Sequence, residues 1–244
     1  MIRAEGLRKR FGTVTAVDGV SFTAEDGAVT GLLGPNGAGK TTTLRMLYAL
    51  MKPDEGHIHV DDIDAVADPQ GAQARLGVLP DTSGLYPRLT SREHIQYFGR
   101  LQGLPPAVIA ERTRQLEQRL DMSSIADRRT GGFSHGERTK VALARALVHD
   151  PNNVLLDEPT NGLDVMSTRA VRDLIRRLRA EGRCVLFSSH VMQEVSALCD
   201  TIIVIARGRV VASGTPDGLR EQAGQRDLED AFVVLAGLEP EAVR

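Results

Sequence analysis

The sequence predicts an α/β fold with a parallel sheet, an N-terminal antiparallel β subdomain and a helical lobe. Three observations predict it. In the second half of the chain, short apolar strands alternate with helical patterns, which is typical of a doubly wound parallel sheet. Residues 2 to 33 alternate apolar and polar positions, as half-buried antiparallel strands do. Between Gly84 and His149 the pattern becomes helical.

The N-terminal β subdomain is predicted from this alternation and from turn residues. Asp26-Gly27 has the composition of a turn, so we expect an antiparallel strand pair that leads into the apolar run Val29 to Leu33. The stretch GHIHVDD, residues 56 to 62, predicts a further short strand.

The helical lobe, about residues 84 to 149, is predicted from its helix-start patterns. Thr90 and Ser134 are each followed three residues later by a glutamate, which is the pattern of a capping box. The prolines at 105 and 106 mark the start of another helix between them.

Strands and helices alternate after the lobe. The predicted strands are Val154 to Leu156, Cys184 to Ser188 and Ile202 to Ala206. A helix between the first two has an apolar stripe and is closed by Gly182; the stripe consists of Val171, Leu174, Ile175 and Leu178. A further helix is expected from Val191.

The chain of 244 residues is expected to form one domain over residues 1 to 215 and a C-terminal helical extension over residues 216 to 244. In the extension, Leu228, Phe232 and Leu235 share one helical face, which should cap the lobe that it touches.

Composition excludes several classes of function. The 30 Lys and Arg against 32 Asp and Glu leave a net charge of -2, so no global positive field exists to hold nucleic acid or anionic lipid. The chain has no Trp and 4% aromatic residues, which leaves few platforms for base stacking. Two cysteines in apolar contexts favour buried, reduced thiols in a cytosolic protein.

We expect the chain to reach a membrane only through a partner. Its longest uninterrupted apolar run, Ile202 to Ala206, is far shorter than the roughly 20 residues that span a bilayer. No signal peptide is recognisable at its start.

A phosphate-binding loop is the strongest motif. GPNGAGKT, residues 34 to 41, matches G-x-x-x-x-G-K-[ST] between an apolar strand and a helix, which predicts a P-loop that binds a nucleotide. The motif alone does not separate a kinase from a GTPase or a transport ATPase. Backbone N–H groups of the loop and the helix N-terminus would hold the phosphates of the nucleotide, with Lys40 at the β and γ phosphates and Thr41 on Mg²⁺. The predicted nucleotide contacts are Gly34, Pro35, Asn36, Gly37, Ala38, Gly39, Lys40, Thr41 and Thr42.

Acidic residues and a histidine follow two later strands. Asp157 and Glu158 end the strand in NVLLDEPTNGLD, where one carboxylate can hold Mg²⁺ and the other can polarise the attacking water. His190 ends the next strand, at the same edge of the sheet, within reach of a γ-phosphate. Asp157 is therefore a predicted metal ligand, and Glu158 and His190 are predicted catalytic residues.

The segment TGGFSHGERTKVALARALVHDP, residues 130 to 151, resembles the ATP-binding cassette (ABC) ATPases. The resemblance covers about residues 1 to 215; it implies a P-loop ATPase core and an ATPase activity coupled to transport across a membrane. It implies that Ser134 and Gly136, in the signature sequence, point at the ATP of a second cassette. Two copies of the chain would then bind head to tail as a homodimer.

Other matches to the family carry further roles. In RFGTVTAVDGVSF the resemblance implies that Phe11 stacks on adenine and that Val17 contacts the nucleotide. It also makes Thr160 to Asp164 the dimer-contact D-loop and His190 the switch histidine. Alternative interpretations are that Phe11 is a core residue, that Ser134 is only a helix N-cap, and that Asp164 caps the following helix.

Two departures from the family pattern stand out. Asp81 replaces the usual glutamine between core and lobe, where the family residue ligates Mg²⁺ and senses the membrane part; Asp81 is thus a predicted metal ligand. His135 replaces the first glycine of the signature. It is either a phosphate ligand or has its ring turned away from the nucleotide, and we favour the second because helix N-termini bind phosphate through backbone donors.

The segment GVLPDTSGLYPRLTSRE and the segment LEDAF near the C-terminus resemble the separate-chain ATPases of ABC-2-type exporters, including sodium-extruding and drug-exporting systems. The resemblance implies a separate membrane permease as partner and a peripheral, cytoplasmic location on the inner face of the cell membrane. Closure would pass to the permease through residues 81 to 98. Alternatives are a soluble ABC ATPase acting on ribosomes or DNA, and a binding-only pseudo-ATPase.

Overall fold

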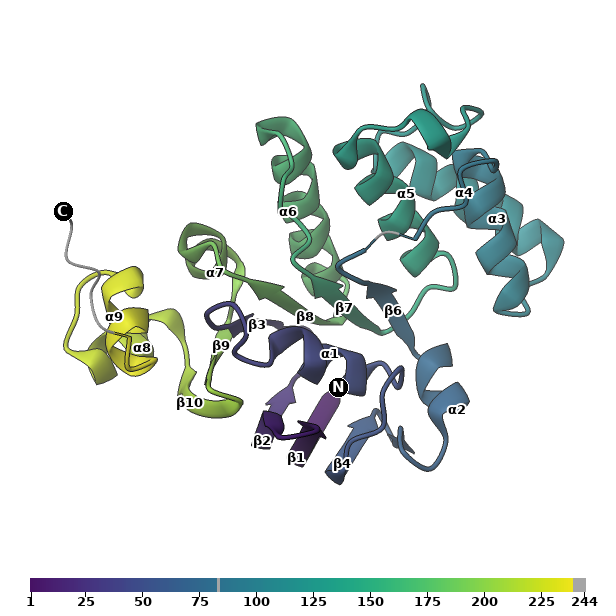
Figure 1. Cartoon of the computed structure of the whole chain (residues 1–244). Coiled ribbons are helices and arrows are strands. Elements are labelled where there is room, and N and C mark those ends of the chain that lie inside the picture. The colour runs from purple at the N-terminus through teal and green to yellow at the C-terminus, as the bar shows by residue number, and fades with distance from the viewer. Residues whose placement is uncertain (83, 239–244) are drawn as a thin grey trace.

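The structure is a computed structural model and describes residues 1–82 and 84–238. It holds two sheets with helices packed on them (Figure 1). The strands are β1 Ile2–Phe11, β2 Val14–Ala24, β3 Val29–Leu33, β4 Glu55–Val60, β5 Ile63–Asp64, β6 Leu76–Leu79, β7 Asn153–Asp157, β8 Cys184–Ser189, β9 Thr201–Ala206 and β10 Arg209–Gly214. The helices are α1 Lys40–Leu47, α2 Pro69–Ala74, α3 Ser91–Leu101, α4 Pro106–Arg119, α5 His135–Leu147, α6 Val165–Ala180, α7 Met192–Leu198, α8 Pro216–Ala223 and α9 Leu228–Leu235, with a 3₁₀ turn at Thr130–Gly132.

The parallel sheet is confirmed and has six strands in the order β10-β9-β3-β8-β7-β6. All neighbours pair in parallel except β10, which pairs antiparallel with β9. Strand β3 therefore lies between β8 and β9, although more than 150 residues separate it from them in the chain. This order brings the carboxyl ends of β3, β7 and β8 to one edge of the sheet.

The antiparallel subdomain is a second sheet with the order β2-β1-β4-β5. One part of the sequence prediction was wrong: Asp26-Gly27 does not close the strand pair. The hairpin turn is Gly12-Thr13, because Phe11 pairs with Val14. Asp26-Gly27 instead joins β2 to β3, which belong to different sheets. A two-residue turn suits a twisted hairpin, and Gly12 supplies its positive φ of 58°.

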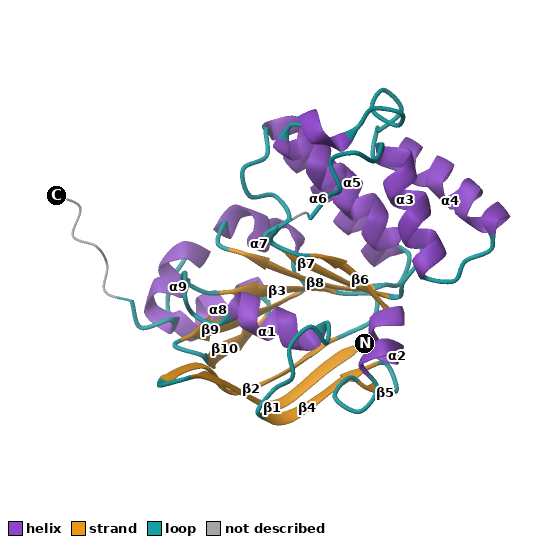
Figure 2. Ribbon diagram, turned by 45° about the vertical axis from the view of Figure 1, so that its right-hand side comes forward, coloured by secondary structure: helices purple, strands orange, loops and turns teal. Residues whose placement is uncertain are grey.

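Helix α1 lies between the two sheets (Figure 2). Its buried face, which includes Leu44 and Leu47, joins one apolar cluster with residues of both sheets, such as Ile2 and Leu186. A second cluster on the other face of the parallel sheet includes Phe187 and the inner faces of α5 and α6. The packing of α1 between the two sheets thus fixes the position of the loop before it.

The helical lobe contains α3, α4 and α5, as expected, and it stands at one end of the parallel sheet (Figure 1). Helix α9 contacts α8 and α7 at the other end of the sheet, so it covers the core near α7 and does not touch the lobe. Its Leu228 and Phe232 are buried as expected. The predicted extension continues to residue 244, and residues 239 to 244 lie outside the described part.

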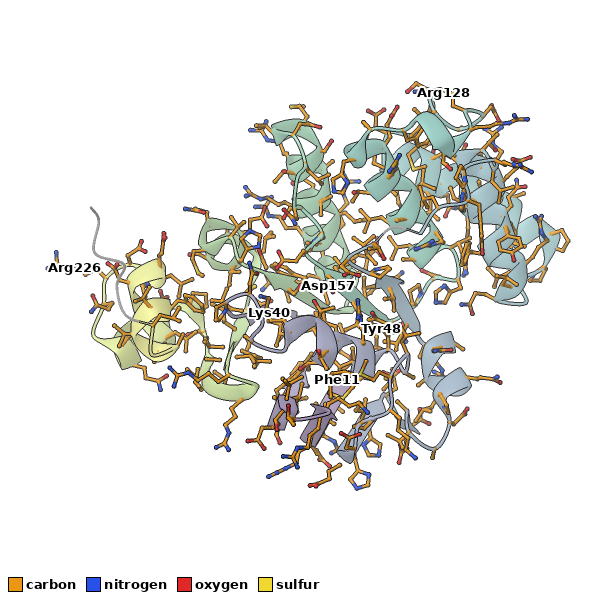
Figure 3. The ribbon with its side chains drawn as sticks, viewed as in Figure 1. Phe11, Lys40, Tyr48, Arg128, Asp157 and Arg226 are labelled. Atoms are coloured by element: carbon orange, nitrogen blue, oxygen red, sulfur yellow. The ribbon has the colours of Figure 1, made fainter. Side chains whose placement is uncertain are left out.

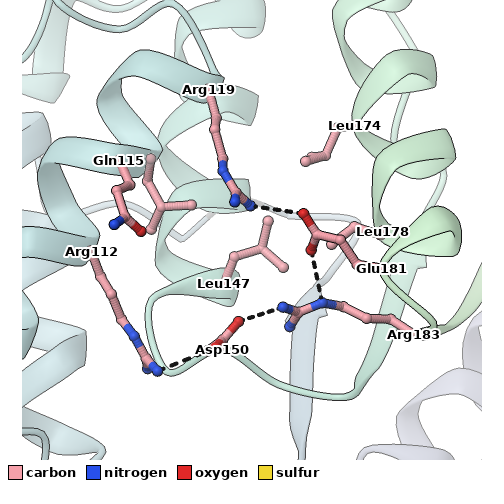
Figure 4. A pocket seen from close by; sticks show the side chains of 10 residues that line it. Arg112, Gln115, Arg119, Leu147, Asp150, Leu174, Leu178, Glu181 and Arg183 are labelled. Atoms are coloured by element: carbon pink, nitrogen blue, oxygen red, sulfur yellow. Dashed lines mark hydrogen bonds and ion pairs between the residues drawn. The ribbon is translucent and has the colours of Figure 1, made fainter.

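A chain of ion pairs joins lobe and core around a cavity of about 230 Å³ between α4 and α6 (Figure 4). Arg119 of α4 pairs with Glu181 at 3.3 Å, and Glu181 pairs with Arg183 at 3.1 Å. Asp150 bridges Arg183 and Arg112 of α4. These contacts attach the lobe at its base, away from the phosphate-binding loop. Within the described residues, no helix has the length and apolar character needed to cross a membrane.

Candidate nucleotide site

The loop between β3 and α1 forms the floor of a pocket of about 490 Å³. Gly39 has a φ of 104°, and a Cβ there would lie 2.4 Å from the carbonyl oxygen of Ala16, so only glycine fits. Helix α1 begins at Lys40 and directs its free N–H groups into the pocket. The lining residues are Ala16, Pro35, Asn36, Gly37, Ala38, Gly39, Lys40, Thr41, Thr42, Glu158, Asn161 and His190.

Lys40 is the buried cation of the pocket. Its Nζ donates to the carbonyl oxygens of Gly34 at 2.6 Å and Pro35 at 3.2 Å, and it lies 4.0 Å from Oε1 of Glu158. Burial lowers the pKa of Lys40, while the charges of Glu158 and Asp157 oppose the shift. The ammonium is therefore held among oxygen acceptors, where phosphate oxygens are suitable partners.

Asp157 is the buried anion and ends β7. It is 3% exposed, and its Oδ1 accepts from the Ser188 hydroxyl at 2.6 Å, because Asp157 and Ser188 are in register on β7 and β8. Burial raises the pKa of Asp157; the hydroxyls of Ser188 and Thr41 oppose the shift, and the charge of Asp81 adds to it. Its Oδ2 is buried and has no hydrogen-bond partner among the described residues. A partnerless buried carboxylate oxygen is well suited to a cation.

These donors fit Mg²⁺. Thr41 and Asp157 offer hard oxygen ligands, which Mg²⁺ prefers. In residues 1–82 and 84–238, no group of three or more His, Cys, Asp or Glu could hold a metal ion. The protein would thus provide only part of the coordination, as in sites where phosphate oxygens and water complete it.

Glu158 and His190 meet at the mouth of the pocket. Nδ1 of His190 lies 2.8 Å from Oε2 of Glu158, and the Glu158 N–H donates to the Ser188 hydroxyl at 2.9 Å. Glu158 has a φ of 49°, which turns the chain away from β7 as soon as the strand ends. The carboxylate is therefore held by a histidine at one side and near Lys40 at the other.

Other predicted site residues lie outside the lining. Phe11 ends β1 and is 48% exposed, so it is not a core residue; Figure 3 shows it below the central pair Lys40 and Asp157. Val17 is buried beneath Gly39 and does not line the pocket. Ala16, which precedes Val17, lines it instead.

Asp81, also outside the lining, follows β6. Its Oδ2 lies 3.5 Å from Nη2 of Arg45, and its Oδ1 accepts from the Thr82 N–H at 2.9 Å. It nevertheless lies close enough to Asp157 for its charge to act on that carboxyl. Its role as a metal ligand stays a prediction.

The signature sequence begins α5 and is separate from this pocket. Ser134 is the N-cap of α5: its hydroxyl accepts from the Glu137 N–H at 3.2 Å, and its own N–H donates to Glu137 at 2.8 Å. Asp164 caps α6 by accepting from the Ser167 N–H at 2.9 Å. Both capping roles are thus present. Neither Ser134 nor Gly136 lines the pocket of its own chain.

Sequence reasoning did not place Ala16 or Asn161 in the pocket. Ala16 adjoins the predicted Val17, and Asn161 belongs to the predicted D-loop, so both lie within segments that the motifs had marked. The exact residues depend on how β2 and the loop after β7 pack against residues 35 to 42.

The profile of the ABC transporter family matches residues 17–161. This chain belongs to the ABC transporter family. The ABC transporter ATP-binding protein NatA of Bacillus subtilis (strain 168) is 48% identical over 221 residues, which are 90% of each chain. The cassette is therefore an ABC ATPase subunit of a transporter.

A further relative and a solved structure also support membership of this family. The Nod factor export ATP-binding protein I of Ralstonia nicotianae is 41% identical to this cassette over 90% of the chain and 68% of that protein. The solved structure of the ATP-binding subunit of an ABC transporter matches with a TM-score of 0.90 and 28% identity, over 96% of this cassette and 99% of that chain. The α/β fold with its antiparallel sheet is thus that of the family.

Proposed function

We propose that this cassette powers an exporter: a pair of identical chains hydrolyses ATP and drives a separate membrane permease. The observation that carries the hydrolytic part is the Glu158 carboxylate, held at the mouth of the phosphate-binding pocket between Lys40 and His190. The names of the similar NatA and Nod factor export proteins support export.

Each residue has a distinct task in this mechanism. The N–H groups of residues 37 to 42 bind the β and γ phosphates, and Lys40 turns from the Gly34 carbonyl toward them. Thr41 and Asp157 would hold Mg²⁺, which would neutralise charge on the phosphates. Glu158 accepts a proton from the attacking water, and Nδ1 of His190 keeps that carboxylate in place.

A second copy of the chain completes the site. Ser134 and Gly136 begin α5 at a distance from the pocket of their own chain, so they can serve a phosphate only in a partner's pocket. Val165 and Met166, beside them at the start of α6, are large apolar residues exposed to solvent. A head-to-tail homodimer would cover these side chains and place each signature helix over the other chain's ATP.

The permease would dock in an apolar groove of about 320 Å³ between the end of α1 and the lobe. Tyr48, Leu76, Val78 and Phe98 line it, and Leu50 is 68% exposed. Leu101, on the adjoining helix α3, is 63% exposed. Such a surface suits an amphipathic helix from the cytoplasmic side of a permease, which would place the cassette peripherally on the inner face of the membrane.

The test of hydrolysis is Glu158→Gln. We expect the purified variant to bind ATP normally, while hydrolysis falls by about 10² or more, because the amide cannot accept the proton of water. Lys40→Ala should instead weaken ATP binding itself. Glu25→Gln, which changes an exposed carboxylate at the opposite end of β3, is the control and should hydrolyse ATP at the normal rate. Near-normal turnover by Glu158→Gln would contradict the proposed role of Glu158.

A further inference from the structure

A histidine of the signature helix bonds to the loop that follows β7. Nε2 of His135 lies 2.9 Å from the carbonyl oxygen of Asn161. A carbonyl oxygen can only accept, so Nε2 carries a hydrogen and donates it. The ring thereby joins the helical lobe to the core within one chain.

The carbonyl that His135 holds belongs to the wall of the ATP pocket. Asn161 lines that pocket, and its N–H donates to the Glu158 carbonyl at 3.1 Å, which closes a turn over residues 158 to 161. Leu163 closes the next turn by donating to the Thr160 carbonyl at 3.2 Å. The position of Asn161 is therefore tied to the backbone that carries Glu158.

A second contact beside His135 fixes the same two segments. A Cβ on Gly136 would lie 2.8 Å from Oγ of Ser167, and that hydroxyl is already bonded to Oδ2 of Asp164 at 2.7 Å. The starts of α5 and α6 thus approach closely, and a side chain at position 136 would separate them. This approach explains the glycine within a single chain, apart from any phosphate.

We propose that His135 is a positioning residue that couples the signature helix to the ATP pocket of its own chain. The coupling rests on the proposed function: when α5 of one chain meets the ATP of the other, its motion reaches Asn161 and Glu158 through this hydrogen bond. Each ATP site then influences the other chain's catalytic carboxylate. The alternative role, a phosphate ligand acting on the partner's ATP, would be left to Nδ1, because Nε2 already donates to Asn161.

Amide hydrogen exchange on the nucleotide-free chain tests the coupling without any catalysis. His135→Ala should speed exchange at Asn161 and Leu163 by about fivefold, the effect of losing one hydrogen bond. His135→Gln retains an N–H donor and should stay within about twofold of wild type, whereas His135→Leu should behave like alanine. Lys140→Ala is the matched control, because it removes another side-chain bond from α5, to the Asp121 carbonyl at 3.1 Å.

ATPase kinetics test whether the hydrogen bond of His135 affects hydrolysis. For His135→Ala we expect kcat to fall about fivefold with KM for ATP within about twofold, and His135→Gln to recover at least half of the rate. Unchanged exchange in His135→Ala, or no recovery by His135→Gln in either measurement, would overturn the proposal. A wild-type chain that fails to hydrolyse ATP would instead contradict the proposed function, while the exchange result would still decide the coupling.

Discussion

Asp157 lies in a setting that disfavours its own negative charge. Burial raises its pKa above the usual 3.8, and Oδ2 has no partner among the described residues. A raised pKa in the folded state means that this group stabilises the fold fully below about pH 3.8 and that this stability is lost as the pH rises through the raised pKa. At neutral pH the folded protein therefore retains an unfavourable buried charge.

Asp157→Asn removes that charge and leads to a prediction. We expect the nucleotide-free variant to unfold at a higher temperature than wild type near pH 7, with the difference shrinking as the pH falls toward about 4. With ATP and Mg²⁺ added, wild type should gain thermal stability and the variant should gain little, because a metal ligand is lost. Thermal unfolding over this pH range measures both. A variant less stable than wild type at pH 7 without nucleotide would show that the charge is not unfavourable.

Among the helices, α3 and α5 begin in the same way. Each has a complete capping box: the Thr90 hydroxyl accepts from the Glu93 N–H at 3.2 Å, and the Ser134 hydroxyl accepts from the Glu137 N–H at 3.2 Å. Their returning bonds to the glutamates are both 2.8 Å. The two caps therefore have equal structural value, while only Ser134 belongs to the signature sequence.

Comparing Thr90 with Ser134 separates the capping role of Ser134 from its proposed role in ATP hydrolysis. Thr90→Ala and Ser134→Ala should each lower the free energy of unfolding by about 1 kcal/mol. Only Ser134→Ala should also lose ATPase activity, by about tenfold or more, because its hydroxyl would meet the γ-phosphate in the partner's site. Denaturant unfolding and ATPase rates measure the two effects. Equal activity in both variants would make Ser134 a cap and nothing more.

At the scale of the whole molecule, the sheet order separates three surfaces. The ATP pocket lies at the carboxyl edge of the parallel sheet, and the apolar groove lies between α1 and the lobe. Helix α9 covers the end of the sheet that is opposite the lobe. The ion-pair chain from Arg112 to Glu181 attaches the lobe to the core at its base.

The groove gives a prediction about location. Coexpressed with its permease, the wild-type chain should sediment with membranes, while Leu50→Asp should stay in the supernatant and keep its basal ATPase rate within about twofold. Val234→Asp, which changes an exposed apolar residue on α9, is the control and should sediment like wild type. Firm membrane binding by the chain expressed alone would contradict docking through a permease, and copurification with ribosomes would favour the soluble alternative.

Local sequence patterns predict the chemistry of the pocket. Residues 34 to 39 form a loop before a helix because glycine conformations and helix starts are local properties. Asp157, Glu158 and His190 could be placed together because the carboxyl ends of parallel strands share one edge. The capping boxes at Thr90 and Ser134 were readable for the same local reason.

Which distant residues are in contact depends on tertiary packing. Gly12-Thr13 closes the hairpin in place of Asp26-Gly27 because the strand after Asp26-Gly27 joins the other sheet. Ala16 lines the pocket because packing of β2 beneath Gly39 buries Val17. His135 reaches Asn161 because α5 and α6 pack with their starts in contact. Periodicity and motifs constrain neighbours along the chain, whereas these contacts depend on burial shared by segments far apart in it.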